Sequence, residues 1–212
     1  MKNLLAVLLL FFTVNTMAEG ASSVPQMGKE YDQTTQIIAT ANPAKIEVIE
    51  LFWYGCSHCY NFEPTVTSWV KSLSKDVTFK RVPGLPNPSW APMAKTHYAL
   101  EALGLTEKLH AKLFEAIHKQ KTLDPTNELA AIDWITKESG LNRKKVQEAF
   151  NSFSTSTQLN RAAQIFRASG ATGVPSLVID GKYITSLSTT NSNEELVRVA
   201  NYLINQARNA KK

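Results

Sequence analysis

Cysteine and histidine are scarce in this sequence of 212 residues, and their scarcity limits the kinds of site that it can build. The only cysteines, Cys56 and Cys59, are separated by two residues. The four histidines include no pair at zinc-finger spacing, since His110 and His118 are eight residues apart. A structural zinc site requires four Cys or His ligands, so we expect no metal centre. A purely structural disulfide is also disfavoured, because it would close a very short loop and constrain the unfolded chain little.

The sequence also lacks an apolar run long enough to cross a bilayer as a helix, which takes about 20 residues. Residues 4–12 form a short unbroken apolar run after the positive charge of Lys2. Thr16 and Ala18 then provide small residues at the two positions that a signal peptidase inspects. We therefore predict a signal peptide, residues 1–18, cleaved after Ala18, and an exported protein. A retained membrane anchor is the alternative interpretation.

No segment concentrates positive charge, although the formal net charge is +5 and the isoelectric point is near 9.1. Lysines and arginines are spread along the chain, whereas a nucleic-acid-binding protein would gather them on one face with aromatic residues between them. We therefore expect no nucleic-acid partner. No internal repeat or low-complexity tract interrupts the sequence, and 43% hydrophobic residues suffice for one ordinary core, with room for an inserted subdomain.

The sequence around the two cysteines predicts a strand, a turn and a helix. Residues 45–54 are rich in apolar and aromatic β-formers, and residues 61–73 have the apolar spacing of a helix. Cys56 should therefore lie where the strand ends and the helix begins. The unpaired N–H groups and the macrodipole of a helix N-terminus, together with a protonated His58, would stabilise a thiolate there. With Cys59 one turn later, the pair is predicted to be a redox dithiol.

Export supports a chemical role for the dithiol. Disulfides persist in oxidising compartments such as the periplasm and are rare in the cytosol. An exported chain with only two cysteines, both in one Cys-x-x-Cys motif, does not use them as a scaffold. We therefore expect this pair to react.

Two further residues bear on the dithiol. Glu50 interrupts the apolar strand six residues before Cys56, and a buried carboxylate is costly unless it is paired or its pKa is raised. The alternative is that Glu50 lies at a strand edge and reaches solvent. Pro175 comes just before a predicted strand, and a cis bond there would expose the backbone of Val174 to an incoming peptide. From the sequence alone, trans is the default.

The rest of the chain changes from strand to helix patterns and back. Helical periodicity predicts helices over residues 91–103, 106–120, 124–139, 143–153 and 158–168, with Thr106 capping the second of them. Strands are predicted over residues 28–32, 76–82, 176–179 and 182–185, and Asn193 is expected to cap a final helix over 194–207. This order predicts an α/β fold with an all-helical insertion. We place the insertion at residues 89–169, between residues 19–88 and 170–212 of one domain.

Residues 52–60, FWYGCSHCY, together with Glu50 and with Gly173-Val174-Pro175, resemble the DsbA family of thiol:disulfide oxidoreductases. The export signal and the helical insertion are also similar to that family, and the likeness covers essentially the whole chain after the signal peptide. The resemblance implies a thioredoxin-like fold that donates a disulfide to unfolded or reduced exported proteins in the periplasm. It implies a DsbB-type membrane quinone reductase as the re-oxidant and no cofactor.

The resemblance also implies a role for each residue of the motif. Cys56 would be the exposed nucleophile, Cys59 the resolving cysteine, and His58 the stabiliser of the Cys56 thiolate. The commonest family dipeptide between the cysteines is Pro-His, whereas this chain has Ser57 in place of proline. In this family the stabilisation of the thiolate is attributed chiefly to the histidine. We therefore retain the prediction of an oxidase and leave its redox potential open.

Outside the motif, Pro175 matches the cis-proline of the family, so Ser57, Val174 and Pro175 are expected to contact the substrate. Glu50 matches a buried acid that is proposed to manage protons at Cys59. In some members a lysine pairs with this acid. Here Phe79 takes the matching place, and Lys80 would face the other side of its strand. We therefore expect Glu50 to be buried without a cation and to titrate well above a normal glutamate.

Two other classes of function remain open. A disulfide isomerase or reductase would use the same dithiol, but isomerases of this kind carry a dimerisation domain, and none is visible in the sequence. A monomer is therefore expected. A peptide-binding chaperone would need only an apolar groove beside the cysteines, and binding that persists after both cysteines are replaced would support it.

Overall fold

The computed structural model describes residues 23–211 of the chain. The predicted signal peptide, residues 1–18, and its cleavage site lie outside these residues. Among the described residues, no helix is both long enough and apolar enough to cross a membrane.

One mixed sheet forms the centre of the fold, in the strand order β1-β5-β4-β2-β3. Its strands are β1 (Asp32–Gln33), β2 (Ile46–Phe52), β3 (Val77–Pro83), β4 (Ser176–Ile179) and β5 (Tyr183–Ser186). The central strand β2 pairs in parallel with β3 and antiparallel with β4, and every one of its residues is buried. A parallel pair requires a crossover connection, and α1 (Ser57–Ser72) provides it.

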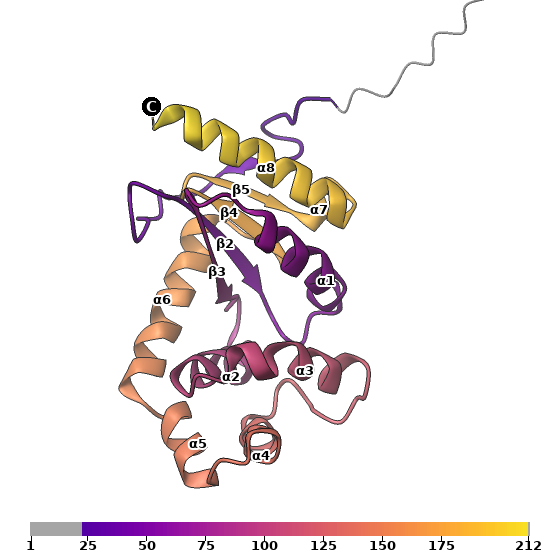
Figure 1. The fold of residues 1–212 in the computed structure, drawn as a ribbon, viewed down its shortest axis with the longest axis vertical. Coiled ribbons are helices and arrows are strands. Elements are labelled where there is room, and N and C mark those ends of the chain that lie inside the picture. The colour runs from indigo at the N-terminus through magenta and orange to yellow at the C-terminus, as the bar shows by residue number, and fades with distance from the viewer. Residues whose placement is uncertain (1–22, 212) are drawn as a thin grey trace, which may run out of the picture.

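Helices cover both faces of the sheet (Figure 1). On one face, α1 and α8 (Asn193–Ala210) pack their apolar sides against β2 and β4. On the other face, α6 (Phe153–Ser169) contributes Ile165 and Phe166, which pack against Ile49 and Leu51 of β2. Because side chains alternate along a strand, β2 supplies apolar residues to both layers.

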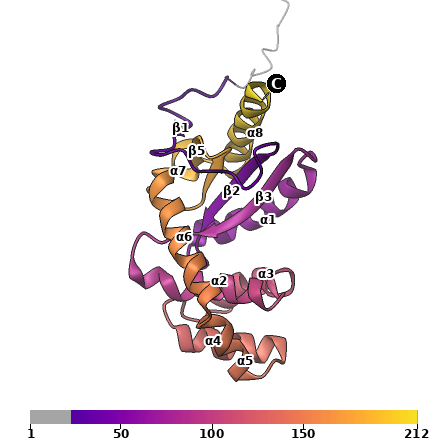
Figure 2. The same cartoon turned by 90° about the vertical axis from the view of Figure 1, so that its left-hand side faces the viewer.

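The remaining long helices form a separate layer beyond the ends of β2 and β3 (Figures 1 and 2). They are α2 (Ala91–Ala102), α3 (Thr106–His118), α4 (Glu128–Ser139) and α5 (Arg143–Phe150), preceded by the short 3₁₀ helix η1 (Pro88–Trp90). Their core joins Phe52 and Tyr54 from the end of β2 with Cys59 of α1. The cysteine motif therefore lies between the sheet and the helical layer.

The structure confirms the α/β class and the predicted order of the main elements, with local differences in their bounds. The first strand is β1, later than the predicted 28–32, where only a single bridge joins Met27 and Tyr31. Helix α6 begins five residues earlier than predicted, because the side chain of Ser152 accepts the N–H of Thr155 as an N-cap.

The starts or caps of three further helices differ from the prediction, the ends of α3, α5 and α8 differ by two or three residues, and one short helix was missed. Helix α4 begins at Glu128, after the cap Asn127. Leu105 rather than Thr106 precedes α3 as its cap, and Ser192 rather than Asn193 caps α8. The four-residue helix α7 (Leu187–Thr190) had no signal in the sequence. The division into residues 19–88, 89–169 and 170–212 remains a prediction.

Candidate active site

Cys56 occupies the predicted junction between strand and helix. It is the N-cap residue of α1, with extended backbone angles (φ −88°, ψ 118°), and its N–H donates to the carbonyl of Trp53 over 3.0 Å. Cys56 is partly exposed, whereas Cys59, one turn into the helix, is 0% exposed. Both are free thiols in this structure. An incoming sulfur can therefore reach Cys56 more easily than Cys59.

The pKa of Cys56 is lowered to about 6. The largest cause is the hydrogen bond from the Cys59 thiol, and burial opposes it. The backbone N–H groups of Cys59 and His58 lower the pKa further, and the charge of His58 contributes least among these causes. The sequence prediction attributed the thiolate to the helix N-terminus and to His58. The structure adds the Cys59 thiol, whose effect depends on side-chain geometry that the sequence does not reveal.

Cys59 behaves in the opposite way. Burial raises its pKa well above the ordinary thiol value, and the neighbouring Cys56 raises it further. A negative charge in the pair therefore resides on Cys56, while Cys59 holds its proton. Such an asymmetric pair has one good leaving group and one sulfur that must be protonated when it is released.

The peptide bond between Val174 and Pro175 is cis, as the resemblance implied. The carbonyl oxygen of Val174 lies 3.4 Å from the Cys56 sulfur and accepts a hydrogen bond from its thiol. Beside this contact is a cavity of about 210 Å³, which His58, Gly173, Val174 and Pro175 line together with Ser186, Leu187 and Ser188. Sequence reasoning missed these last three residues, because they belong to β5 and α7 and reach the site only through the fold. Ser57 is exposed at the first turn of α1.

Glu50 is buried, with 1% of its surface exposed, but it is not isolated from cations as predicted. Its Oε2 lies 3.0 Å from Nε of Arg81. The parallel register places Glu50 of β2 beside Arg81 of β3. The sequence analysis considered only Phe79 and Lys80 as possible partners of Glu50 and therefore missed Arg81. Burial nevertheless dominates and raises the pKa of Glu50 to about 7, while Arg81 lowers it.

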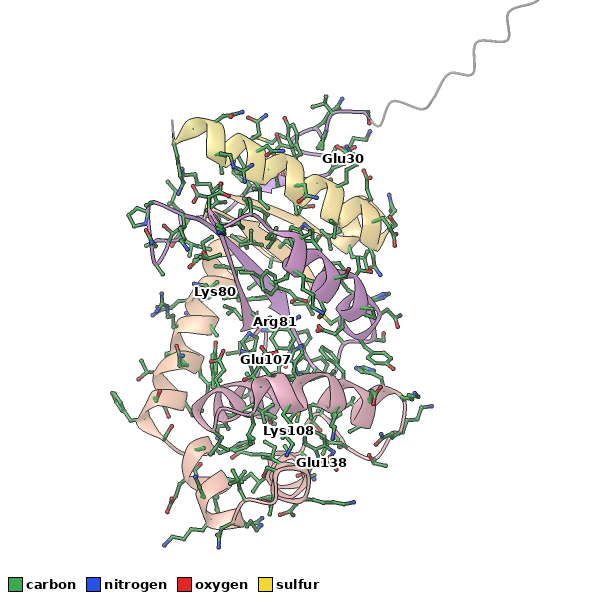
Figure 3. All side chains as sticks on the ribbon, in the orientation of Figure 1. Glu30, Lys80, Arg81, Glu107, Lys108 and Glu138 are labelled. Carbon is green, nitrogen blue, oxygen red and sulfur yellow. The ribbon has the colours of Figure 1, made fainter. Side chains whose placement is uncertain are left out.

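Arg81 also connects Glu50 to a wider polar cluster. Its Nη2 donates to Oε1 of Glu63 over 2.9 Å, and Oε2 of Glu63 lies 3.3 Å from Nε2 of His110. Glu63, Arg81 and His110 line a cavity of about 320 Å³ between α1 and α3, and Figure 3 shows Arg81 at the end of the sheet that faces Glu107 of α3. Lys80 pairs instead with Glu47, a second buried acid of β2 that the sequence analysis did not single out.

The site offers sulfur chemistry. Within residues 23–211, no three His, Cys, Asp or Glu side chains gather as ligands for a metal ion. The reactive groups of the site are a low-pKa thiol at a helix N-terminus, a buried partner thiol and a carbonyl that faces the first sulfur. This arrangement can exchange a disulfide with a second dithiol.

Comparisons with known proteins agree with this chemistry. The thiol:disulfide interchange protein DsbA of Burkholderia cepacia is 38% identical over 213 residues and covers 100% of both chains. The protein of the same description from Pseudomonas aeruginosa is 39% identical over 186 residues, or 87% of each chain. A crystal structure of Pseudomonas aeruginosa DsbA superposes with a TM-score of 0.79 at 36% identity, covering 88% of this chain and 96% of the other.

These relatives show that the chain has a thioredoxin-like fold and is a thiol:disulfide oxidoreductase. Residues 75–200 match the family described as DSBA-like thioredoxin domain. The chain belongs to the DsbA family of thiol:disulfide oxidoreductases.

Proposed function

We propose that this chain oxidises pairs of cysteine thiols in exported proteins by donating a disulfide formed between Cys56 and Cys59. The observation that carries the proposal is the opposite environment of the two sulfur atoms. Cys56 is partly exposed with a lowered pKa, and Cys59 is fully buried with a raised pKa. A substrate thiolate attacks such a disulfide at its accessible sulfur, and the Cys56 thiolate then stabilises the reduced form of the enzyme.

The reaction has two exchange steps. A substrate thiolate attacks the Cys56 sulfur, a new sulfur–sulfur bond forms, and the Cys56–Cys59 bond breaks with its electron pair on Cys59. A second substrate thiolate then attacks the substrate sulfur of the mixed disulfide, and Cys56 leaves as a thiolate. The substrate loses two electrons, which the reduced enzyme holds. The low pKa of Cys56 favours the second step, because a more acidic thiol is a better leaving group.

Glu50 supports the first step in this proposal. Cys59 takes up a proton when it is released, because burial disfavours its thiolate. Glu50 is buried and has a pKa raised to about 7, so its acid form is available near neutral pH. We assign Glu50 the role of the proton donor to Cys59, and His58 the role of a secondary stabiliser of Cys56. Ser57, Val174 and Pro175 are assigned to substrate contact.

The proposed setting of the reaction follows from the predicted export. A protein cleaved after Ala18 would work in the periplasm, where its substrates are reduced or unfolded exported chains. The reduced dithiol then requires an electron acceptor, and a membrane quinone reductase of the DsbB type fits that need. We propose a monomer, because one chain supplies both cysteines and the cis-proline loop.

Trapping of mixed disulfides tests the assignment of the two cysteines. Cys59→Ser should accumulate mixed disulfides with substrate proteins, because nothing internal displaces the substrate, whereas Cys56→Ser should neither trap substrates nor oxidise them. The adducts are counted on non-reducing gels after alkylation of free thiols. Trapping by Cys56→Ser instead of Cys59→Ser would reverse the roles.

A second measurement separates an oxidase from an isomerase or reductase. The reduction potential of the Cys56–Cys59 pair, measured by equilibrium with glutathione, should lie well above that of the glutathione couple. Oxidation of a reduced model protein should then proceed without added oxidant, in proportion to the enzyme supplied. A potential below that of glutathione would favour the reductase. Substrate binding that survives replacement of both cysteines would favour the chaperone.

A further inference from the structure

Tyr54, two residues before Cys56, makes hydrogen bonds to two histidines of α3, one through its side-chain hydroxyl and one through its main-chain carbonyl. Its hydroxyl lies 2.7 Å from Nδ1 of His110, and its carbonyl oxygen lies 2.7 Å from Nε2 of His118. The histidines are eight residues apart, which puts them on one stripe of the helix and about 12 Å apart along its axis. Tyr54 bridges this separation with its side chain at one histidine and its main chain at the other.

The surrounding groups determine the direction of each hydrogen bond. Nε2 of His110 lies 3.3 Å from the carboxylate of Glu63, and a nearby carboxylate favours the ring proton on that nitrogen, so we assign the Tyr54 hydroxyl as the donor to Nδ1. A carbonyl oxygen only accepts, so Nε2–H of His118 donates to Tyr54. Both bonds join α3 to the turn between β2 and α1.

The environment of Tyr54 makes these bonds strong constraints. Tyr54 is 1% exposed and His110 is 6% exposed, so the hydrogen bond between them is not exchanged for water, whereas His118 is half-buried. The Tyr54 ring packs edge-on against Phe52 and also contacts Phe114 of α3. An unpaired hydroxyl in this position would cost about 1–3 kcal/mol, so Tyr54 stays with His110.

His118 also contacts the other side of the dithiol. Its ring stacks on Tyr60, the residue after Cys59, with a centroid distance of 5.1 Å and an interplanar angle of 16°. A single side chain of α3 therefore touches the segment before Cys56 and the segment after Cys59. Any shift of the turn relative to α1 must disturb one of these two contacts.

We propose that His110, His118 and Tyr54 are positioning residues for the reactive thiolate, and that they act by fixing the turn 53–56 against the first turn of α1. This inference rests on the proposed role of Cys56. The Cys56 thiolate is stabilised by the Cys59 thiol and by the N–H groups of His58 and Cys59, all of which lie in the first turn of the helix. Hydrogen bonds to sulfur weaken steeply with distance and angle. The turn sets both, because the N–H of Cys56 is bonded to Trp53 within it.

The test measures the Cys56 pKa from the ultraviolet absorbance of the thiolate in single variants of the reduced chain. Tyr54→Phe removes only the hydroxyl, and His118→Ala removes the donor to the carbonyl. Each should raise the Cys56 pKa by about one unit, so that the thiolate fraction at low pH falls about tenfold. The equilibrium constant with glutathione should shift by a similar factor toward a weaker oxidant. His118→Gln, whose amide can donate to the same carbonyl, should restore most of both values.

His97 is the matched control, since it is a buried histidine in the same aromatic cluster, 5.2 Å from the Phe52 ring, with no hydrogen bond to Tyr54. His97→Ala should lower the thermal stability of both redox forms and leave the Cys56 pKa unchanged. The inference is overturned if Tyr54→Phe and His118→Ala leave that pKa unchanged, or if His97→Ala shifts it equally. The proposed function itself would fail if the unmodified chain did not oxidise thiols. That failure is distinguishable, because the Cys56 pKa of each variant is measured without any oxidation assay.

Discussion

At the scale of single residues, the dithiol owes its reactivity more to Cys59 and the helix backbone than to the histidine between the cysteines. His58 is exposed, and water screens the interaction of its charge with the thiolate. The Cys59 thiol is buried and donates directly to Cys56, so its effect is not screened. The motif therefore works partly through Cys59, the sulfur that the substrate does not attack.

This ranking gives the first prediction. Cys59→Ala should raise the Cys56 pKa more than His58→Ala does, because it removes the largest of the lowering contributions. Thiolate absorbance across a pH titration of each reduced variant measures both shifts. Ser57→Ala is the control, since this neighbouring exposed residue is not among the causes of the shift. A larger shift in His58→Ala would show that the charge of the histidine dominates.

Glu50 gives a prediction with a definite pH dependence. Its acid form is the proposed proton donor to Cys59, and that form is lost as the pH rises through about 7. Glu50→Gln should slow turnover below this pH and leave the Cys56 pKa nearly unchanged. The ratio of the unmodified rate to the Glu50→Gln rate should therefore fall as the pH passes through about 7. The ordinary pKa values of carboxyl and thiol groups lie at about 4 and about 9, so the rates are measured between about pH 5 and 9. A ratio that stays constant over this range would show that Glu50 is not the proton donor.

At the scale of elements, the turn between β2 and α1 depends on Gly55. A Cβ placed there would clash with the ring of Trp53, which stacks on Trp90 of η1 at a centroid distance of 4.2 Å. Glycine is therefore required by close packing rather than by a left-handed backbone angle. The stacked pair closes one side of the turn, and the histidines of α3 hold the other.

Gly55→Ala should consequently push Trp53 out of its stack with Trp90. Overpacking of this kind costs about 1–3 kcal/mol of unfolding free energy, measured by urea titration. The tryptophan fluorescence of the folded variant should change as well. Gly173→Ala is the matched control, because no atom lies within 4 Å of its added Cβ, and it should leave stability nearly unchanged. Equal stability of the two variants would mean that Trp53 can move without cost.

Local patterns were sufficient to predict most elements, but not the contacts between them. The strand at β2 and the helix at α1 follow from apolar periodicity, and β4 from its β-branched run before Asp180-Gly181. The pairing of Glu50 with Arg81 depends instead on the register of two strands whose paired residues are 31 positions apart in the chain. The bonds of His110 and His118 to Tyr54 depend on how α3 packs on the turn, so their eight-residue spacing excluded a zinc finger without revealing their role.

At the scale of the whole molecule, the sheet with its two covering layers meets the helices α2–α5 at one end (Figure 1), and the dithiol packs against the core of these helices. The sheet places the cis-proline loop beside Cys56, and the helical layer covers Cys59. One sulfur is therefore open to substrate and the other is kept from water. This division depends on both parts of the fold, which is why α1 has apolar contacts on both sides.

The lowered Cys56 pKa also has a consequence for the stability of the entire chain. A group whose folded-state pKa is depressed stabilises the fold fully above its unfolded pKa, near 9.0 here, and this stability is lost as the pH falls to about 6. Only the reduced form has this thiol. The unfolding free energy of the reduced form, relative to the oxidised form, should therefore rise between pH 6 and 9.0. The lowering of the Cys56 pKa from 9.0 to about 6 corresponds to about 4 kcal/mol of unfolding free energy at most. Partial exposure of the sulfur reduces this contribution to about 2 kcal/mol.

Urea unfolding of both redox forms across this pH range measures the difference, and groups that titrate equally in the two forms cancel from it. The comparison stays below pH 9.0, because the raised pKa of Cys59 acts in the opposite direction above that value. Cys56→Ser should abolish the rise with pH in the reduced chain while retaining the other titrating groups. A reduced form whose advantage does not change with pH would show that folding does not stabilise the Cys56 thiolate. The driving force for disulfide donation would then have to come from strain in the oxidised form, because a strong oxidant needs one of these two sources.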